Sequence, residues 1–214
     1  MLVKTFVHFV CLLVVISVLS IAKEVRAIPI VETGSQWEYT ILNNDLWPNW
    51  SSVNYNSFDW QGNSQWYTGS AAFGNEYAGG LAFNTYWQAN QDMALQYNFN
   101  VDGIISGPIT LNVASDNGFL VFINGTQVAK ENAEGYTKYW EYTLDISSFS
   151  DVFRSQGTNI IQVLAEDHGV ATFFDLQMNA NVSAAPVPEP ATFLLLGAGL
   201  VGLSTIRRKK VSKT

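Results

Sequence analysis

Tryptophan is the residue type in this chain best suited to binding chemistry. All seven tryptophans lie between residues 37 and 140 of the 214-residue chain. Flat indole faces stack on the apolar faces of sugar rings, while Asn, Asp and Gln side chains hydrogen-bond the hydroxyls. Two polar stretches carry the aromatics that we predict to form a carbohydrate platform: Trp47, Trp50, Trp60, Trp66 and Tyr67. The alternative is that these side chains simply pack beneath long loops.

Catalytic chemistry has little support in the sequence. His168 is the only histidine after the N-terminal apolar run, and no G-x-S-x-G elbow accompanies it. We interpret residues 166–169 as a polar turn after a buried strand. One histidine and no cysteine in that part of the chain also argue against a zinc site. Glycoside hydrolysis needs two carboxylates roughly 5–9.5 Å apart, and among so many acids some such pair is inevitable. We therefore predict no enzyme activity.

The charge of the central region restricts its partners. Between residues 28 and 206 the basic residues are Lys130, Lys138 and Arg154, against 17 acidic residues. Such a surface excludes nucleic acid, whose phosphates require a basic face, and disfavours anionic lipid. Neutral glycans and divalent cations remain compatible. Only 14% of the chain is charged while 14% is aromatic, a composition typical of an extracellular β domain.

The central region shows the two-residue period of β-strands. Apolar and polar residues alternate over 93–101, 109–113, 140–144 and 174–182. The alternation over 140–144 predicts that Trp140 lies in the core. Residues 118–124 and 159–165 are continuously apolar, which predicts central strands. Turn residues such as Asp116-Asn117-Gly118 and Asn124-Gly125 separate these segments. We predict an all-β domain over residues 28–182, an antiparallel β-sandwich or jelly roll.

Residues 114–128 combine a strand ending in Asp-Asn-Gly, an apolar strand, Asn-Gly and a returning strand. Together with 58–60, 66–74 and 142–159, this pattern is similar to the galactose-binding-like jelly rolls that are appended to glycosidases. The resemblance implies that fold for about residues 36–182. It implies no required cofactor and at most a structural calcium ion, with Asp59 and Asp175 as candidate ligands. The alternative is that both are ordinary surface carboxylates.

The first 27 residues have the order of a signal peptide. Lys4 precedes an apolar run over 6–22, and Val25-Arg26-Ala27 provides the small-residue pattern that signal peptidase recognises. We predict cleavage after Ala27, so that Ile28 becomes the first mature residue. A permanent N-terminal anchor is the alternative.

The C-terminal end has three parts in a fixed order. A linker over 183–190 contains Pro188, Glu189 and Pro190, an uncharged run over 191–206 follows, and the tail 207–214 opens with Arg207 and Arg208. Sixteen helical residues extend about 24 Å, which barely spans a hydrocarbon core of about 30 Å. The basic cluster would hold the C-terminus in the cytoplasm and leave the β domain outside. We therefore predict a short transmembrane helix.

This order over residues 187–210 resembles the PEP-CTERM sorting domain. The resemblance implies recognition by an exosortase, which cuts near the motif after export across the inner membrane and a transient membrane anchorage. It also implies a Gram-negative bacterium that makes exopolysaccharide and biofilm. We predict a cell-surface or extracellular protein, a non-catalytic glycan-binding module of that matrix. The alternatives are a structural or adhesive matrix protein without a sugar site and, more weakly, an extracellular hydrolase.

Overall fold

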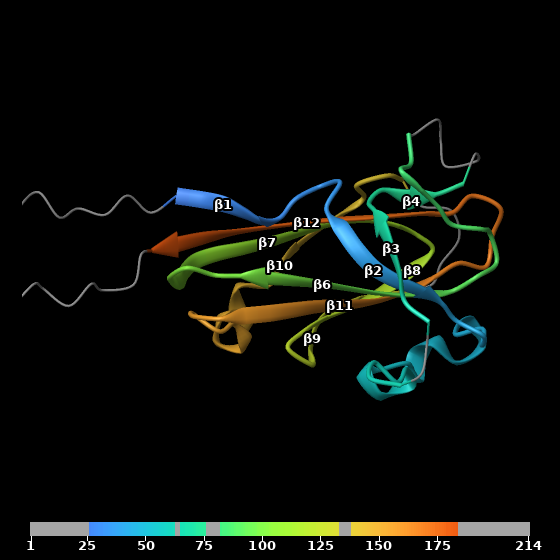
Figure 1. Cartoon of the computed structure of the whole chain (residues 1–214), viewed down its shortest axis with the longest axis horizontal. Helices are drawn as coiled ribbons and strands as arrows, with labels where there is room; N and C mark the ends of the chain where they lie inside the picture. The colour runs from blue at the N-terminus through green and yellow to red at the C-terminus, as the bar shows by residue number, and fades with distance from the viewer. Residues whose placement is uncertain (1–25, 63–64, 76–81, 133–137, 184–214) are drawn as a thin grey trace, which may run out of the picture. The chain divides into compact units, whose positions relative to one another are not determined.

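The computed structural model describes residues 26–62, 65–75, 82–132 and 138–183, and these form two β-sheets (Figure 1). The first sheet has the order β10 (Tyr142–Asp145), β7 (Ile104–Asp116), β12 (Phe173–Ser183), β4 (Phe73–Gly74) and β5 (Thr85–Tyr86), with β1 (Arg26–Val31) also paired to β12. The second has the order β3 (Tyr67–Ser70), β2 (Gln36–Ile41), β6 (Met93–Asn100), β11 (Thr158–Glu166), β8 (Gly118–Ile123) and β9 (Thr126–Glu131).

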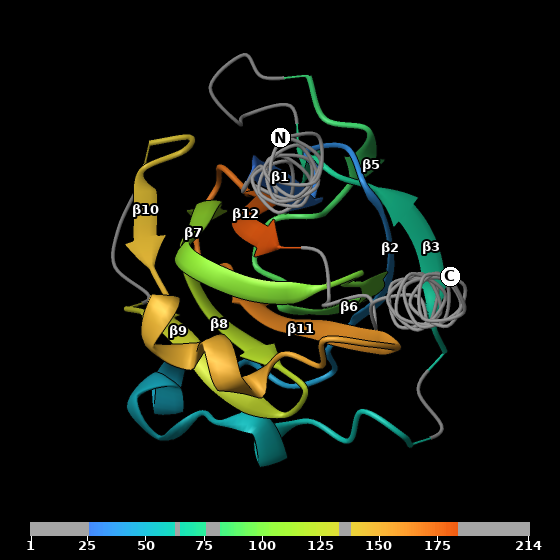
Figure 2. The ribbon, with the colours of Figure 1, turned by 90° about the vertical axis from the view of Figure 1, so that its left-hand side faces the viewer.

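Successive strands cross from one sheet to the other. The chain passes from β6 in the second sheet to β7 in the first and back to β8, and it crosses again from β10 to β11 to β12. Figure 2 views the strands end-on, with the 3-10 helix η3 (Ser147–Val152) between β10 and β11. Every strand pair is antiparallel except the two-residue pair β4–β5. This crossing pattern confirms the predicted antiparallel β-sandwich of jelly-roll type.

The predicted strands occur where their sequence patterns place them. β6 pairs with β11 from Asn100↔Thr158 to Met93↔Ala165. The hairpin between β8 and β9 turns at Asn124 and Gly125, whose φ angles of 50° and 83° suit the Asn-Gly turn. β8 and β11 both lie inside the second sheet, as their continuous apolar runs predict.

Apolar side chains between the two sheets form the main buried cluster, which we call the sandwich core. β8 contributes Phe119, Val121 and Ile123, and β12 contributes Phe174 and Leu176. These positions alternate along their strands, because a strand directs successive side chains to opposite faces. The sandwich core therefore explains the period of two in the sequence.

A second buried cluster, which we call the loop core, lies on the other face of the second sheet. There Leu120 and Phe122 of β8 pack against an irregular segment, residues 42–62 and 65–66, which contains the 3-10 helices η1 (Trp47–Ser52) and η2 (Tyr55–Ser57). Figure 1 shows these two short helices alongside the second sheet. Both faces of β8 are buried, which accounts for its uninterrupted apolar sequence.

One strand prediction needs correction. Trp140 precedes β10 instead of lying in it, and its φ angle of 58° places it in the left-handed region. Its side chain is half-buried against Tyr139 and belongs to neither large core. The alternation with Tyr142 and Leu144 misled, because residues that form a turn next to a strand can continue the strand's pattern.

The two ends of the chain lie largely outside the described residues. The segments outside the described residues are most of the predicted signal peptide, the linker with Pro188, Glu189 and Pro190, the predicted helix over 191–206 and the tail from Arg207. The described part of the chain contains no helix of the length and hydropathy that crossing a bilayer requires. β1 begins at Arg26, so the predicted cleavage after Ala27 would leave residues 28–31 to pair with β12.

Candidate functional site

The five predicted platform aromatics do not form one exposed surface. Trp47 and Tyr67 are 49% and 48% exposed, whereas Trp50 and Trp60 are only 6% and 8% exposed. Trp66 is half-buried and stacks on Trp60, with 6.4 Å between ring centroids. Trp50 and Trp60 are therefore packing residues of the loop core, and the expectation that they present open faces for stacking was wrong.

Hydrogen bonds explain why Trp50 is held inward. Its Nε1 donates to the carbonyl of Glu131 at 2.8 Å. The Nζ of Lys130 donates to the carbonyls of Trp50, Ser51 and Val53 at 2.8–3.2 Å and lies 5.6 Å from the Trp50 ring centroid. β9 thus fastens η1 to the edge of the second sheet.

Trp60 is fixed in a similar way on the face of the sheet. Its Nε1 donates to the carbonyl of Tyr55 at 3.0 Å, and its ring stacks on that of Tyr55 with 5.6 Å between centroids. The same ring meets Phe122 of β8 edge-on. The indole is therefore sandwiched within protein and has no face left for a ligand.

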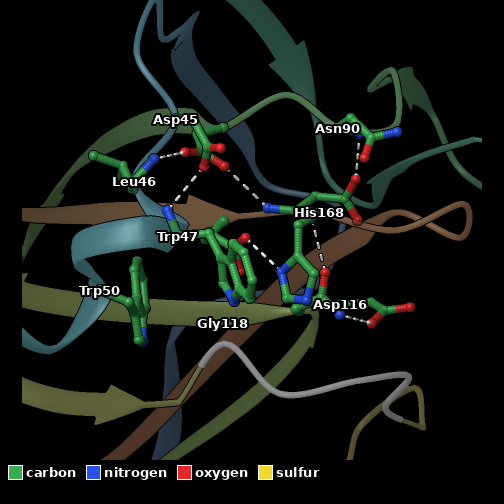
Figure 3. A network of polar contacts seen from close by, with 12 residues as sticks. Asp45, Leu46, Trp47, Trp50, Asn90, Asp116, Gly118 and His168 are labelled. Atoms are coloured by element: carbon green, nitrogen blue, oxygen red, sulfur yellow. Dashed lines mark hydrogen bonds and ion pairs between the residues drawn. The ribbon is translucent and has the colours of Figure 1, made fainter.

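Trp47 is the exposed tryptophan next to a cleft. It opens η1, where the following Pro48 suits the first turn of a helix. Its ring lies against the imidazole of His168, with 4.8 Å between centroids and 31° between planes (Figure 3). Asp45 orders this turn, because its Oδ1 accepts the backbone N–H of Trp47 at 2.9 Å.

The cleft beside this pair has a volume of about 320 Å³ and a polar lining. Three chain segments form it: residues 42–45 after β2, 90–92 before β6 and 167–168 after β11. Apart from Leu42, its lining consists of Asn, Gln, Asp and His side chains. These are groups that hydrogen-bond hydroxyls and coordinate cations.

Asp92 joins these segments at the base of the cleft. Its Oδ2 accepts the N–H of Leu46 at 2.5 Å and its Oδ1 accepts the N–H of Asp167 at 3.1 Å. Burial raises the pKa of Asp92 to about 6, even though both backbone hydrogen bonds oppose the rise. A similar bond links Asp167 to the N–H of Asn90. These bonds tie the loops together.

Glu166, the last residue of β11, lies beneath His168 and is completely buried. Its Oε1 is 2.7 Å from the Nδ1 of His168. Burial raises the pKa of Glu166 above its ordinary value, and the imidazole and the N–H of Gly118 oppose that rise. The backbone N–H of His168 donates to Oδ1 of Asn117 at 3.0 Å, which holds the backbone of His168 in place.

The carboxylates of Asp45, Asp92 and Glu166 form an acidic cluster that the sequence did not predict. One oxygen from each lies within 4.8 Å of the others. The interpretation of 166–169 as a polar turn after a buried strand needs correction at Glu166, which is the buried last residue of β11, so that the strand ends one residue later than predicted. It missed that this turn meets two other loops.

The predicted calcium ligands lie elsewhere. Asp59 is exposed in a turn, where its Oδ1 accepts the N–H of Gln61. Asp175 is buried on β12, where its Oδ2 accepts the hydroxyl of Tyr139 at 3.2 Å. Among the described residues, the group of three carboxylates suited to a metal ion includes neither. That Asp59 and Asp175 bind a structural calcium ion stays a prediction.

Comparison with solved structures finds similar β domains at low identity. A PA14 domain of the MpAFP antifreeze protein is 15% identical with a TM-score of 0.37, and the match covers 71% of this chain and 87% of that one. A β-glucuronidase from Ruminococcus gnavus in complex with D-glucuronic acid is 12% identical with a TM-score of 0.44, covering 75% and 30%. A family 35 carbohydrate-binding module from an environmental isolate is 16% identical with a TM-score of 0.34, covering 55% and 93%.

No curated protein matches the chain. A family model does match its C-terminal end, over residues 186–209, and that family is described as the PEP-CTERM protein-sorting motif. The match includes Pro188-Glu189-Pro190, the apolar run and the start of the basic tail. Residues 186–209 of this chain are thus a PEP-CTERM protein-sorting motif, which indicates export and a cell-surface or extracellular destination.

Proposed function

We propose that this is an exosortase-sorted surface protein whose β-sandwich binds neutral polysaccharide beside Trp47. The observation that carries the proposal is the pairing of an exposed indole with a polar cleft. An indole face accepts the apolar side of a sugar ring, and amide and carboxylate groups accept or donate to its hydroxyls. The acidic charge of the domain favours a neutral glycan over an anionic one.

The size and rigidity of the site support a short glycan segment. A volume of about 320 Å³ lies at the lower end of the range for ligand pockets, which suits one or two sugar units. His168 covers one side of Trp47, and Asp45 fixes its backbone, so the indole is ordered before a ligand arrives. Such preorganisation lowers the entropic cost of binding.

The sorting motif sets where this binding takes place. β12 ends at Ser183, close in sequence to Pro188, so cleavage near the motif would release the whole sandwich. In our proposal signal peptidase and exosortase process the chain, which passes through a membrane-anchored stage on the helix 191–206. The released or attached domain then joins the exopolysaccharide matrix of a biofilm.

Binding is tested by affinity electrophoresis of the exported protein in the exopolysaccharide of its host. Trp47→Ala should weaken retardation at least tenfold, because the variant loses the indole face that stacks on the sugar ring. The fold should be kept, because truncation of an exposed side chain opens no cavity. Tyr67→Ala is the matched control, since Tyr67 is equally exposed but its ring packs on Tyr39, whereas the ring of Trp47 packs on His168 of the cleft lining. Unchanged retardation of Trp47→Ala, with or without an effect of Tyr67→Ala, would contradict the proposed site.

A matrix protein without a sugar site is favoured by the burial of Trp50 and Trp60. In that case the acidic sandwich would act as a structural unit, and the Trp47 cleft would have no ligand. The same experiment separates the two functions, because a matrix protein would migrate alike in gels with and without polysaccharide.

A hydrolase is favoured by one observation, the two buried carboxylates of Asp92 and Glu166 next to a polar cleft. Retaining glycosidases place two carboxyl groups about 5–5.5 Å apart. Here both oxygens of Asp92 accept backbone N–H groups, and one oxygen of Glu166 lies 2.7 Å from the Nδ1 of His168, so both carboxylates are engaged within the protein. We therefore assign them a positioning role. Release of reducing ends from the host polysaccharide, abolished by Glu166→Gln, would reverse this assignment.

A further inference from the structure

Three carboxylates from three separate segments converge at the base of the cleft. Asp45 follows β2, Asp92 precedes β6 and Glu166 ends β11, yet one oxygen of each lies within 4.8 Å of the other two. Like charges so close together repel, and burial of Asp92 and Glu166 removes the water that would screen them. A positive charge among them would relieve both effects.

Glu166 provides a second and independent observation. Its side chain has no solvent exposure, and its Oε1 faces the Nδ1 of His168. Its Oε2 is also buried and accepts no hydrogen bond of normal geometry from the described residues. Buried carboxylate oxygens are almost always paired, so a buried oxygen without such a partner on a residue of the acidic cluster points to a ligand that completes its coordination.

The donor set selects the kind of ion. All three donors are carboxylate oxygens, and the nearest imidazole nitrogen is engaged by Glu166, which suits a hard cation better than zinc. Oxygens bound to one Ca²⁺ at 2.3–2.6 Å can be about 5 Å apart, and Ca²⁺ accepts a flexible geometry, so three oxygens within 4.8 Å of one another fit around one such ion. The cleft leaves room for the water molecules that would complete the coordination shell.

We propose that Asp45, Asp92 and Glu166 bind one calcium ion, which fastens the loops around the cleft. His168 would orient Glu166 from outside the coordination shell, as partners of metal ligands commonly do. Asp45 is exposed, so the ion can enter from solvent. Because Oδ1 of Asp45 accepts the N–H of Trp47, the ion would also fix the start of η1. This inference does not depend on whether the protein binds a glycan.

The test measures calcium binding by the full chain, purified in detergent, stripped with EDTA and dialysed. Titration calorimetry with CaCl₂ should give one site per chain. A calcium concentration of 100 times the dissociation constant should raise Tm by roughly 5–10 °C. NaCl at matched ionic strength should leave Tm unchanged. Absence of binding heat and of a Tm shift at millimolar CaCl₂ would overturn the proposal, and an equal response to MgCl₂ would overturn the choice of calcium.

Asp45→Asn is the decisive variant, because Asp45 is exposed and its replacement keeps the acceptor for Trp47. The affinity for calcium should fall tenfold or more, and Tm without calcium should stay the same. Asp59→Asn is the matched control, since Asp59 is also exposed and its Oδ1 also accepts the N–H two residues ahead. Equal calcium affinity in the two variants would overturn the assignment of Asp45. No glycan is present, so the outcome is separate from that of the polysaccharide assay.

Discussion

The sandwich core and the loop core lie on opposite faces of the same sheet, and different kinds of chain build them. Strands cover one face of β8, where Phe119 and Val121 meet the first sheet. On the other face Leu120 and Phe122 meet an irregular segment that carries Trp50 and Trp60. Buried apolar area is stabilising whether a strand or a loop provides it. Both cores therefore determine where the loops around the cleft can lie.

The two cores leave different marks in the sequence. Alternation identifies strands that bury one face, and it says nothing about what covers the other. A continuous apolar run such as β8 requires apolar cover on both faces. The tryptophans of residues 42–66 cover the outer face of the second sheet, where they pack on the apolar side chains of β8. The loop aromatics and the continuous apolar run of β8 are therefore two signs of the same buried cluster.

The largest expected effects compare the two cores on one strand. Phe119 and Phe122 are both completely buried on β8 and point to opposite cores. Phe119→Ala and Phe122→Ala should each lower the free energy of unfolding by about 3–5 kcal/mol, because each opens a cavity in a packed cluster. Urea denaturation of the two variants measures this. If Phe122→Ala cost less than about 1 kcal/mol, residues 42–66 would be a loose cover instead of a core.

The sequence could predict the strands well and the site poorly. β6, β7, β8, β11 and β12 are long enough to show their period, whereas β4 and β5 have two residues each and show none. Asp92 and Glu166 stand at the ends of predicted strands. Their proximity follows from the register that pairs Met93 with Ala165.

That register is a tertiary property, because the pattern of a strand does not reveal which strand lies beside it. Asp45 could not be predicted at all, since it lies in the irregular segment. Its approach to the cluster depends on the hydrogen bond from the backbone N–H of Leu46 to the carboxylate of Asp92. The loop aromatics were the available signal, because a segment packed on the second sheet must bring its polar neighbours to the sheet's edge.

The stability of the protein should depend on pH through a buried carboxyl group of the first sheet. Asp175 lies on β12, and burial raises its pKa to about 6 from an ordinary 3.8. The folded protein therefore holds a proton that the unfolded chain releases, and stability falls as pH rises from about 4 to 6. This group should lower the free energy of unfolding at pH 7 by at most about 3 kcal/mol.

Asp175→Asn removes that charge and keeps an acceptor for the N–H of Leu176. In EDTA the variant should be about 2 kcal/mol more stable than the parent at pH 7, and equal to it at pH 4. Urea denaturation at both pH values provides the comparison. The same difference between variant and parent at both pH values would show that the carboxyl does not titrate in this range.

The attachment of the loop core to β9 can be loosened selectively. Lys130→Met keeps the aliphatic stem but removes the three hydrogen bonds to the carbonyls of Trp50, Ser51 and Val53. We expect a loss of about 1–2 kcal/mol and faster hydrogen exchange in η1. Lys138→Met is the control, since the side chain is exposed and should change stability by less than about 0.5 kcal/mol. Equal exchange rates in the two variants would mean that Lys130 does not hold η1.

The smallest effect is expected at Trp140, because this tryptophan belongs to neither core. Its side chain is half-buried against Tyr139, and its backbone has a φ of 58°. Trp140→Ala should cost about 1 kcal/mol, against about 3–5 kcal/mol for Trp60→Ala in the loop core. Trp140→Gly should be no less stable than Trp140→Ala. Both variants lose the contact with Tyr139, but glycine adopts a positive φ without strain. Thermal melts of the three variants measure the order, and a Trp140→Ala variant as unstable as Trp60→Ala would place Trp140 in a core after all.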